Sequence, residues 1–182
     1  PAAIRMVSAP VPGAVLYLPR LALAGALEAL AHTGGQPLDD RTAEILRVEA
    51  GIPRFLVDMS DETIPLEAGL DHAISHTKGC YVGQEIIVRI RDRAHGRVAR
   101  HLVGLQLETV DVPQVPQAML SDGRTVGRMT SAVRSIALDT VIALATVHRA
   151  ASAIGTSLTP ENGGTAVVVT LPFVPPSAAP DS

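Results

Sequence analysis

Apolar positions in the first third of the chain predict one strand and two helices. Residues 11–18 are rich in β-forming side chains and predict a strand. The run LALAGALEALA at 21–31 is apolar on all sides and precedes a Gly-Gly pair, so we expect a well-buried helix with a glycine C-cap. From Asp39, the stretch DDRTAEILRVEAG offers polar N-cap side chains and then apolar positions, which predicts a second helix that ends near Gly51. These elements imply two helices packed on one sheet.

The middle of the chain has a different pattern. Residues 54–77 have no clean period and carry five acidic side chains, which predicts a loop-rich segment with one helical turn at 66–70. From Glu85 to Glu108, in the run EIIVRIRDRAHGRVARHLVGLQLE, apolar and charged side chains alternate, and His95-Gly96 offers a turn. This alternation predicts a β-hairpin or two linked strands.

Short apolar runs separated by turn signals continue from residue 96 to residue 174 and predict a small antiparallel barrel. The expected fold class is therefore α+β, with a sheet and packed helices in residues 1–95 and the barrel in 96–174. The Pro-rich residues 175–182 are expected to be a disordered tail. The sequence begins PAAIRMVSAPVPGAVLYLP, without an initiator Met, and we expect an N-terminal portion of the first domain to be missing.

Composition narrows the function classes. The chain has 182 residues, of which 47% are hydrophobic and 2% aromatic, with no Trp. These numbers fit an aliphatic core and do not fit stacked aromatic platforms for nucleic acids. A formal net charge of −3 argues against a polyanionic partner for the whole surface. The longest apolar stretches fall short of the roughly 18 residues of a membrane span, so we expect no membrane contact.

A single cysteine, Cys80, excludes an internal disulfide framework and favours a reducing compartment, so we expect a cytoplasmic protein. One thiolate is also too few for an iron–sulfur cluster, which normally takes four. The sequence contains no GxxxxGKS/T, GxGxxG, HExxH or GxSxG pattern. Nucleotide hydrolysis, a Rossmann cofactor, zinc proteolysis and serine hydrolysis therefore lack support.

The surroundings of Cys80 point to possible thiol chemistry. It lies between two glycines in the run KGCYVGQEIIVRI. Lys78 and the amides of a glycine turn would favour the thiolate, which makes Cys80 and Lys78 candidate catalytic residues. The alternative is a small buried side chain in a turn. His72, His76 and Cys80 share one helical face, but an intervening glycine and the lack of a second cysteine argue against a metal, and we expect none.

Basic side chains crowd residues 89–100, with Asp92 as the single acid among them. This arginine ridge consists of Arg89, Arg91, Arg93, Arg97 and Arg100. Such a ridge would hold an anionic tail such as polyglutamate, or RNA phosphates. The alternative is a solvated strand face whose charges protect a sheet edge.

The stretch from LRVEAG to LVGLQL, residues 46–107, resembles the shared core of the glycine-cleavage T-protein (GcvT) superfamily. Within it, KGCYVGQE resembles the motif K-G-C-Y-x-G-Q-E of the YgfZ branch. The matching residues are Lys78, Gly79, Cys80, Tyr81, Gly83, Gln84 and Glu85. Further on, GRTVGRMTSAV and the terminal LPF resemble the superfamily's C-terminal barrel, so the likeness covers most of residues 39–174.

The resemblance implies a folate-binding protein in which three lobes surround a tetrahydrofolate pocket and the last lobe is a small barrel. Residues 1–95 would then be the C-terminal portion of the folate-binding domain. In the superfamily's RxEAG element a glutamate contacts the pterin, and Glu49 occupies that position, where a carboxylate can accept two parallel N–H bonds from an aminopyrimidine. The alternative for Glu49 is an exposed side chain at a helix end. Tyr81, Gln84 and Arg89 are further candidate folate-binding residues.

Three functions stay open. Members of the YgfZ branch are associated with the maintenance of iron–sulfur enzymes and with tRNA modification, so the first is a folate-dependent accessory factor with iron–sulfur clients, in which Cys80 acts beside the folate. The second is aminomethyl or methyl transfer. It ranks lower because T-proteins generally have an aromatic, non-cysteine segment at KGCYVGQE and a catalytic aspartate in an N-terminal region that this sequence lacks. The third is a noncatalytic scaffold whose arginine ridge contacts RNA or a client protein.

Overall fold

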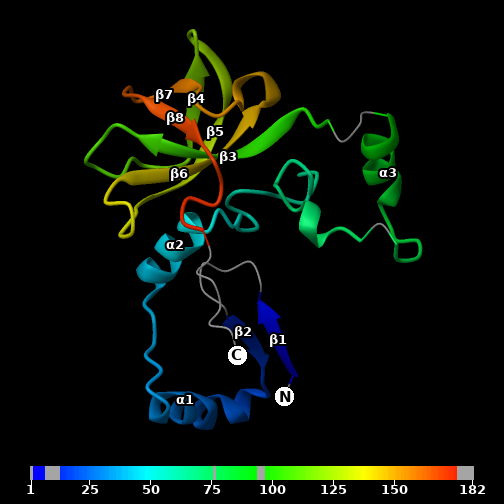
Figure 1. Ribbon diagram of the computed structural model, residues 1–182, viewed down its shortest axis with the longest axis vertical. Helices are drawn as coiled ribbons and strands as arrows, with labels where there is room; N and C mark the ends of the chain where they lie inside the picture. The colour runs from blue at the N-terminus through cyan, green and yellow to red at the C-terminus, as the bar shows by residue number, and fades with distance from the viewer. Residues whose placement is uncertain (1, 7–12, 76, 94–96, 176–182) are drawn as a thin grey trace.

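The computed structural model describes residues 2–6, 13–75, 77–93 and 97–175 (Figure 1). In chain order the elements are β1 (Ala2–Met6), β2 (Gly13–Tyr17), the 3-10 turn η1 (Arg20–Ala22), α1 (Leu23–His32), α2 (Asp40–Glu49), η2 (Asp71–Ala73), α3 (Gln84–Arg93), β3 (Arg100–Leu107), β4 (Gln117–Ser121), β5 (Arg124–Arg134), β6 (Val141–His148), η3 (Arg149–Ala151), β7 (Ser157–Pro160) and β8 (Ala166–Val169). Among the described residues, no helix has the length and apolar character needed to cross a membrane.

The second half of the chain forms a closed antiparallel barrel, as the spacing of its apolar runs predicts. Its strand order is β3-β6-β5-β4-β7-β8. Along β7 and β8 every second side chain is buried, which is the period that points alternate residues into the barrel. Leu105, Met119, Met129 and Leu158 are at most 1% exposed and fill this interior. Two bulges in β5, one opposite β4 and one opposite β6, bend this strand and increase its twist, which helps the sheet to close.

Helix α2 packs against the outside of the barrel through a second apolar cluster. Ile45 and Val48 of α2 meet Val133, Ile142 and Leu144 of β5 and β6. The helix begins where the sequence predicts, because the Asp39 side chain accepts a hydrogen bond from the Thr42 N–H at 2.7 Å. That hydrogen bond also lowers the pKa of the Asp39 carboxyl.

The LPF run near the C-terminus closes over the junction of α2 and the barrel. The N–H groups of Phe173 and Val174 donate to the Glu49 carbonyl at 2.9 and 3.1 Å. The run lies so close to β3 that a Cβ at Gly104 would stand 2.9 Å from both Leu171 and Phe173. The absence of a side chain at position 104 is therefore what lets this segment pack on the strand.

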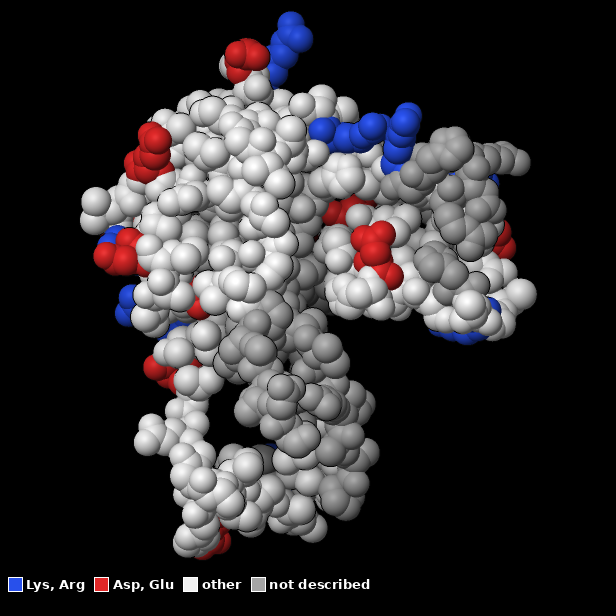
Figure 2. All heavy atoms as spheres, viewed as in Figure 1, with Lys and Arg blue, Asp and Glu red and all other residues white. Residues whose placement is uncertain are grey.

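The expected burial of the first helix is wrong. The helix exists as α1 and ends in the predicted glycine cap, in which Gly35 N–H donates to the Leu30 carbonyl and Gly34 N–H to the Ala31 carbonyl. No residue of α1 is buried, however, and Leu27 is 56% exposed. Strands β1 and β2 pair with each other in a two-stranded sheet, and Figure 2 shows few charged side chains over α1. The sequence thus encodes an apolar helix face that the described residues do not cover.

Of the two strands predicted for residues 85–108, the first is wrong, because α3 forms there instead, and the second is confirmed as β3. The run EIIVRIR has apolar side chains at 86, 87, 88 and 90, of which 86, 88 and 90 fit a strand face and 86, 87 and 90 fit a helix face. Ile87 is 7% exposed and anchors that face. The predicted turn at His95-Gly96 lies outside the described residues, and β3 begins at Arg100.

The loop-rich prediction for residues 54–77 is confirmed. Its described residues, 54–75 and 77, form no α-helix and no strand of a sheet, and a hydrogen-bonded turn occupies 64–70, where Leu70 N–H donates to the Pro65 carbonyl at 3.0 Å. The 3-10 turn η2 follows at Asp71–Ala73. The tail predicted to be disordered falls outside the described residues from position 176 onward.

Candidate functional site

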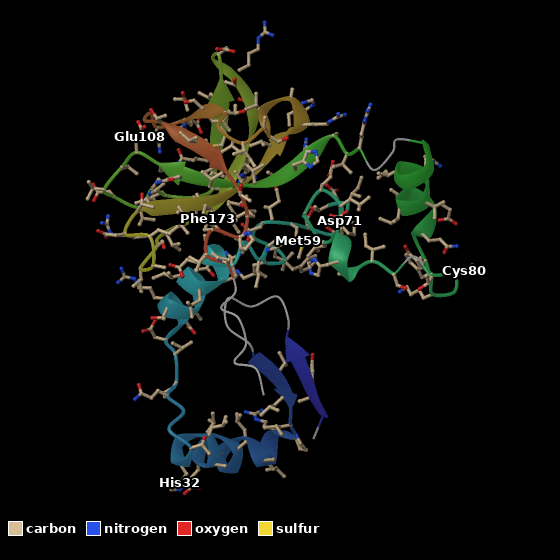
Figure 3. The ribbon with its side chains drawn as sticks, viewed as in Figure 1. His32, Met59, Asp71, Cys80, Glu108 and Phe173 are labelled. Atoms are coloured by element: carbon tan, nitrogen blue, oxygen red, sulfur yellow. The ribbon has the colours of Figure 1, made fainter. Side chains whose placement is uncertain are left out.

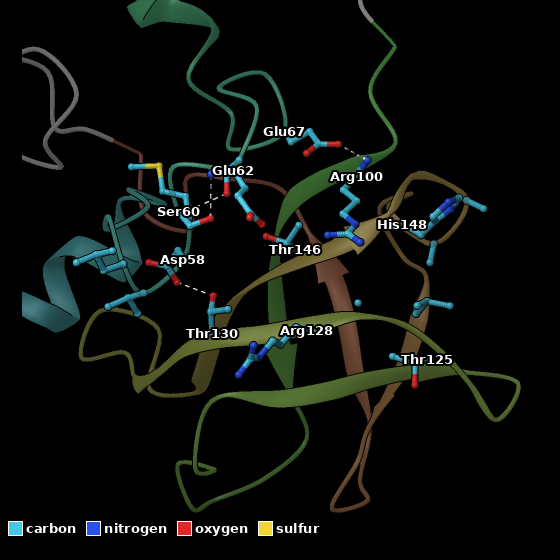
Figure 4. Close-up of a pocket in the computed structure, with 18 residues that line it drawn as sticks. Asp58, Ser60, Glu62, Glu67, Arg100, Thr125, Arg128, Thr130, Thr146 and His148 are labelled. Atoms are coloured by element: carbon cyan, nitrogen blue, oxygen red, sulfur yellow. Dashed lines mark hydrogen bonds between the residues drawn. The ribbon is translucent and has the colours of Figure 1, made fainter.

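A cavity of about 740 Å³ lies between loop segment 56–67 and one side of the barrel (Figure 4). The loop forms one wall and strands β5 and β6 form the other, with the first residue of β3 also in the lining. Its titratable and charged lining residues are Asp58, Glu62, Glu67, Arg100, Arg128 and His148. A volume of this size falls in the usual range of small-molecule sites, about 300–1,000 Å³.

Asp58 fastens the loop wall to the barrel. Its side chain is fully buried. Its Oδ1 accepts hydrogen bonds from Thr130 Oγ1 at 2.6 Å and Ser131 Oγ at 2.7 Å, both on β5. Its Oδ2 accepts from Arg47 Nη1 at 2.8 Å and from the Arg54 N–H at 2.9 Å. The buried carboxylate is therefore paired and hydrogen-bonded on both oxygens, the condition under which a charge tolerates burial.

Arg47 ties α2 into the same network. Its Nη2 and Nε donate to the two oxygens of Glu44 at 2.6 and 2.9 Å, and Nη2 also donates to Ser131 Oγ at 2.7 Å. Arg54 Nη1 donates to Glu44 Oε2 at 3.0 Å. The hydrogen bond from Arg47 lowers the pKa of Glu44, and the charges of both arginines act in the same direction. These hydrogen bonds and ion pairs, here called the Arg47–Asp58 network, hold α2, the loop wall and β5 together.

The lowered pKa of Glu44 predicts a loss of stability in acid. A carboxylate whose pKa is lowered in the folded state contributes its full stabilisation above the ordinary value of 4.5 and loses it as the pH falls through the lowered value. We expect Glu44→Gln to be less stable than wild type at pH 7 and the difference to shrink below pH 4.5. Urea unfolding at a series of pH values measures this, and a difference that stays constant into acid would contradict it.

The far end of the loop wall is attached to β3. The Leu102 N–H donates to the Glu67 carbonyl at 2.8 Å, and the Arg100 N–H donates to Glu67 Oε1 at 3.2 Å. Together with Asp58, these bonds fix the wall at both ends. Figure 2 shows basic side chains over the beginning of β3 and acidic ones over the neighbouring loop, so the cavity lies between groups of opposite charge.

Glu49 lies elsewhere, at the junction of α2 with the β5–β6 turn. It is 3% exposed, and its Oε1 accepts from Ser135 Oγ at 2.5 Å and from the Ala137 N–H at 3.2 Å. The alternative of an exposed glutamate at a helix end is therefore wrong. Glu49 does not line the cavity of Figure 4, and its contact with a pterin stays a prediction.

The residues around Cys80 lie close to one another but far from the cavity. Figure 3 shows Cys80 on the arm that carries α3, away from Met59, which lines the cavity. Cys80 is exposed, so the alternative of a buried side chain is wrong. Lys78 Nζ stands 4.6 Å from the centre of the Tyr81 ring, and the Tyr81 N–H donates to Gln84 Oε1 at 3.4 Å.

The residues proposed for metal and RNA binding are only partly described. His76, which the metal hypothesis needs, lies outside the described residues. Arg89 and Arg97 are exposed. Since Arg89 belongs to α3 and Arg100 to β3, the arginine ridge is not one strand face. Its contact with RNA stays a prediction.

Sequence patterns gave no signal for the central residues of the site. In the sequence, Asp58 is one of several acidic residues in a loop and nothing distinguishes it from the others. Its hydrogen-bond partner Thr130 is 72 positions away. Arg128 reads as a surface position of a strand, and only the closure of the barrel brings it to the cavity. Pairing over such distances leaves no periodic trace in one sequence.

Comparison with known proteins connects this architecture to a superfamily. Residues 100–175 match the family described as the glycine cleavage T-protein C-terminal barrel domain. An aminomethyltransferase of Rippkaea orientalis is 35% identical over 148 residues, which cover 79% of this chain and 39% of the relative. One from Nostoc sp. is 37% identical over 134 residues, which cover 71% of this chain and 35% of the relative.

A solved structure shares the fold. The crystal structure of glycine cleavage system aminomethyltransferase T from Bartonella henselae matches with a TM-score of 0.75 and 24% identity, over 86% of this chain and 44% of that one. The chain thus spans less than half the length of each of these relatives. These similarities do not single out the YgfZ branch, which stays a prediction. They support the glycine cleavage T-protein superfamily for this chain, and they identify residues 100–175 as a C-terminal barrel domain of the T-protein type.

Proposed function

We propose that the chain supplies the barrel and one wall of a tetrahydrofolate-binding site. The observation that carries this proposal is the cavity of Figure 4, which the Arg47–Asp58 network holds open beside the barrel in a chain similar to aminomethyltransferases. Folates offer an aminopyrimidine edge, which donates hydrogen bonds, and a glutamate tail, which accepts them. The cavity has carboxylates for the first and guanidinium groups for the second.

Two carboxylates, those of Glu49 and Glu62, are candidates for the pterin contact. Glu49 occupies the position that the superfamily resemblance implies, but it is buried and its Oε1 already accepts two hydrogen bonds. Glu62 lines the cavity and is exposed. We therefore propose Glu62 as the residue that accepts the aminopyrimidine N–H groups in this chain.

Calorimetric titration of tetrahydrofolate tests this assignment. We expect Glu62→Gln to weaken binding by about 1–3 kcal/mol, because the amide replaces one acceptor oxygen with a donor that faces another donor. Glu49→Gln is the matched variant, with the same change at a position outside the cavity. If only Glu49→Gln weakens binding and both variants fold, Glu49 is the pterin contact and the Glu62 assignment is wrong.

For the activity of the whole protein we propose an accessory role of the YgfZ type, with iron–sulfur client proteins. The KGCYVGQE motif and the exposure of Cys80 support it, because an exposed thiol is accessible to a reaction partner. Aminomethyl transfer is the second candidate, and the names of the relatives favour it. A contact of Arg89, Arg91, Arg93 and Arg97 with RNA is a further proposal, supported by the exposure of Arg89 and Arg97.

A further inference from the structure

The connections at one end of the barrel carry acidic side chains and no basic ones. Three connections lie there: residues 108–116 after β3, 135–140 between β5 and β6, and 161–165 between β7 and β8. This end is opposite the cavity of Figure 4, because β3 runs from Arg100, which lines that cavity, to Leu107. The three connections contain no Lys or Arg, and their acidic residues, all exposed, are Glu108, Asp111, Asp139 and Glu161. We call this surface the acidic end of the barrel, and Glu108 marks it in Figure 3.

The acidic end of the barrel also exposes apolar side chains. Those that are at least 45% exposed are Val110, Val112, Ile136 and Leu138. Arg134 joins the two connections that carry them, because its guanidinium donates to the Val110 carbonyl at 3.4 Å and to Asp139 Oδ1 at 2.7 Å. Exposed apolar side chains that gather on one surface mark interaction sites, whereas single ones need no explanation.

Hydrogen bonds hold this surface in place before any partner binds. The Glu108 N–H donates to the Thr165 carbonyl at 3.0 Å, and the Leu138 N–H donates to Ser135 Oγ at 3.0 Å. A second cavity of about 280 Å³ opens beside Glu108, and the carboxylate residue Asp111 lines it as well. A surface that is already ordered loses little conformational entropy when it binds.

The charge of this end decides which partner it fits. In the part of the chain that the structure describes, Arg134 pairs with Asp139, and no ion pair involves Glu108, Asp111 or Glu161. A nucleic acid or an anionic membrane would meet repulsion from these carboxylates. A second copy docked through the same surface would place acid against acid, which disfavours self-association.

A protein segment with apolar side chains flanked by Lys or Arg complements both features of the surface. Its apolar side chains would cover Val110 and Ile136, and its basic groups would meet carboxylates that have no partner of their own in the described residues. We propose that the acidic end of the barrel docks such a basic and apolar segment of a partner protein, with one Lys or Arg side chain in the 280 Å³ cavity.

Peptide selection on the 182-residue chain tests this inference without a folate. A displayed library of random peptides is enriched on the chain, and fluorescence anisotropy then measures the affinity of the selected peptides. We expect peptides that combine Lys or Arg with aliphatic side chains, and we expect Ile136→Ser to weaken their binding about tenfold or more. Ile154→Ser is the matched control, because Ile154 is 70% exposed, close to the 73% of Ile136, and lies outside the three connections.

A second pair of variants tests the charge. Asp111→Asn is expected to weaken binding of the selected peptides and to reduce its dependence on salt, because salt screens attraction between exposed charges. Asp122→Asn is its control, since Asp122 is exposed in the β4–β5 turn at the other end of the barrel. Thermal unfolding of every variant confirms that it is folded.

The outcomes decide between the possible occupants. The inference is overturned if no peptide is enriched, if the selected peptides are acidic, or if Ile136→Ser and Ile154→Ser have equal effects. Sedimentation velocity of the chain alone tests for a second copy, and a dimer that Ile136→Ser abolishes would assign the surface to self-association instead. None of these measurements depends on tetrahydrofolate, so the inference and the folate proposal stand or fail separately.

Discussion

Replacement of Asp58 by alanine is expected to lower the free energy of unfolding by about 3–5 kcal/mol. The variant leaves the guanidinium of Arg47, only 13% exposed, without one of its two carboxylates. It also removes the acceptor of Thr130 Oγ1 and of the Arg54 N–H. Each of these groups is wholly or partly buried, so water does not replace the hydrogen bond that it loses. Chemical denaturation at pH 7 measures the change.

Asp61→Ala is the control for this variant. Asp61 lies in the same loop and carries the same charge, but it is exposed, so its replacement is expected to change stability by no more than about 0.5 kcal/mol. If Asp58→Ala lowers the free energy of unfolding no more than Asp61→Ala does, the claim that the Arg47–Asp58 network holds the loop wall is wrong. Asp58→Ala should also weaken tetrahydrofolate binding, because the loop wall loses its attachment to β5.

Replacement of Cys80 by alanine is expected to abolish complementation of a strain that lacks the gene while leaving folding intact. The thiol is exposed, so its loss removes a chemical group without opening a cavity in the core. Growth that depends on iron–sulfur enzymes is the readout in the cell, and chemical denaturation is the readout for stability. The two together separate a chemical role from a structural one.

Cys80→Ser serves as the matched variant, because it keeps the size of the side chain but not the nucleophilic sulfur. We expect it to fail as alanine does. Full complementation by both variants would remove the support for a thiol-dependent accessory role, and aminomethyl transfer of the T-protein type would then lead. Loss of activity together with a loss of stability would assign Cys80 to folding.

The barrel could be predicted from the sequence because its signal is local. Short apolar runs separated by turn signals recur from β3 to β8, and these strands close into the barrel. The N-cap of α2 at Asp39 and the glycine cap of α1 are equally local and were confirmed. Features decided within four or five residues are the ones that a single sequence reveals.

The predictions that failed concern features that depend on contacts between residues far apart in the sequence. In EIIVRIR, positions 86, 88 and 90 fit a strand face and positions 86, 87 and 90 fit a helix face, so the pattern alone does not decide between them, and in the structure the run is helical with Ile87 buried. Whether α1 is buried depends on other segments that pack against it, and the sequence of the helix gives no information about those segments. The Arg47–Asp58 network joins α2, a loop and β5 through single polar residues, so no periodicity marks it.

The most direct test of the account locates tetrahydrofolate on the chain. Amide hydrogen exchange with and without the ligand reports which backbone groups it protects. The account predicts added protection in residues 56–67 and in β5 from Thr125 to Thr130, the two walls of the cavity in Figure 4. Protection confined to the KGCYVGQE arm and α3, or no binding at all, would contradict the claim that this cavity is the folate site.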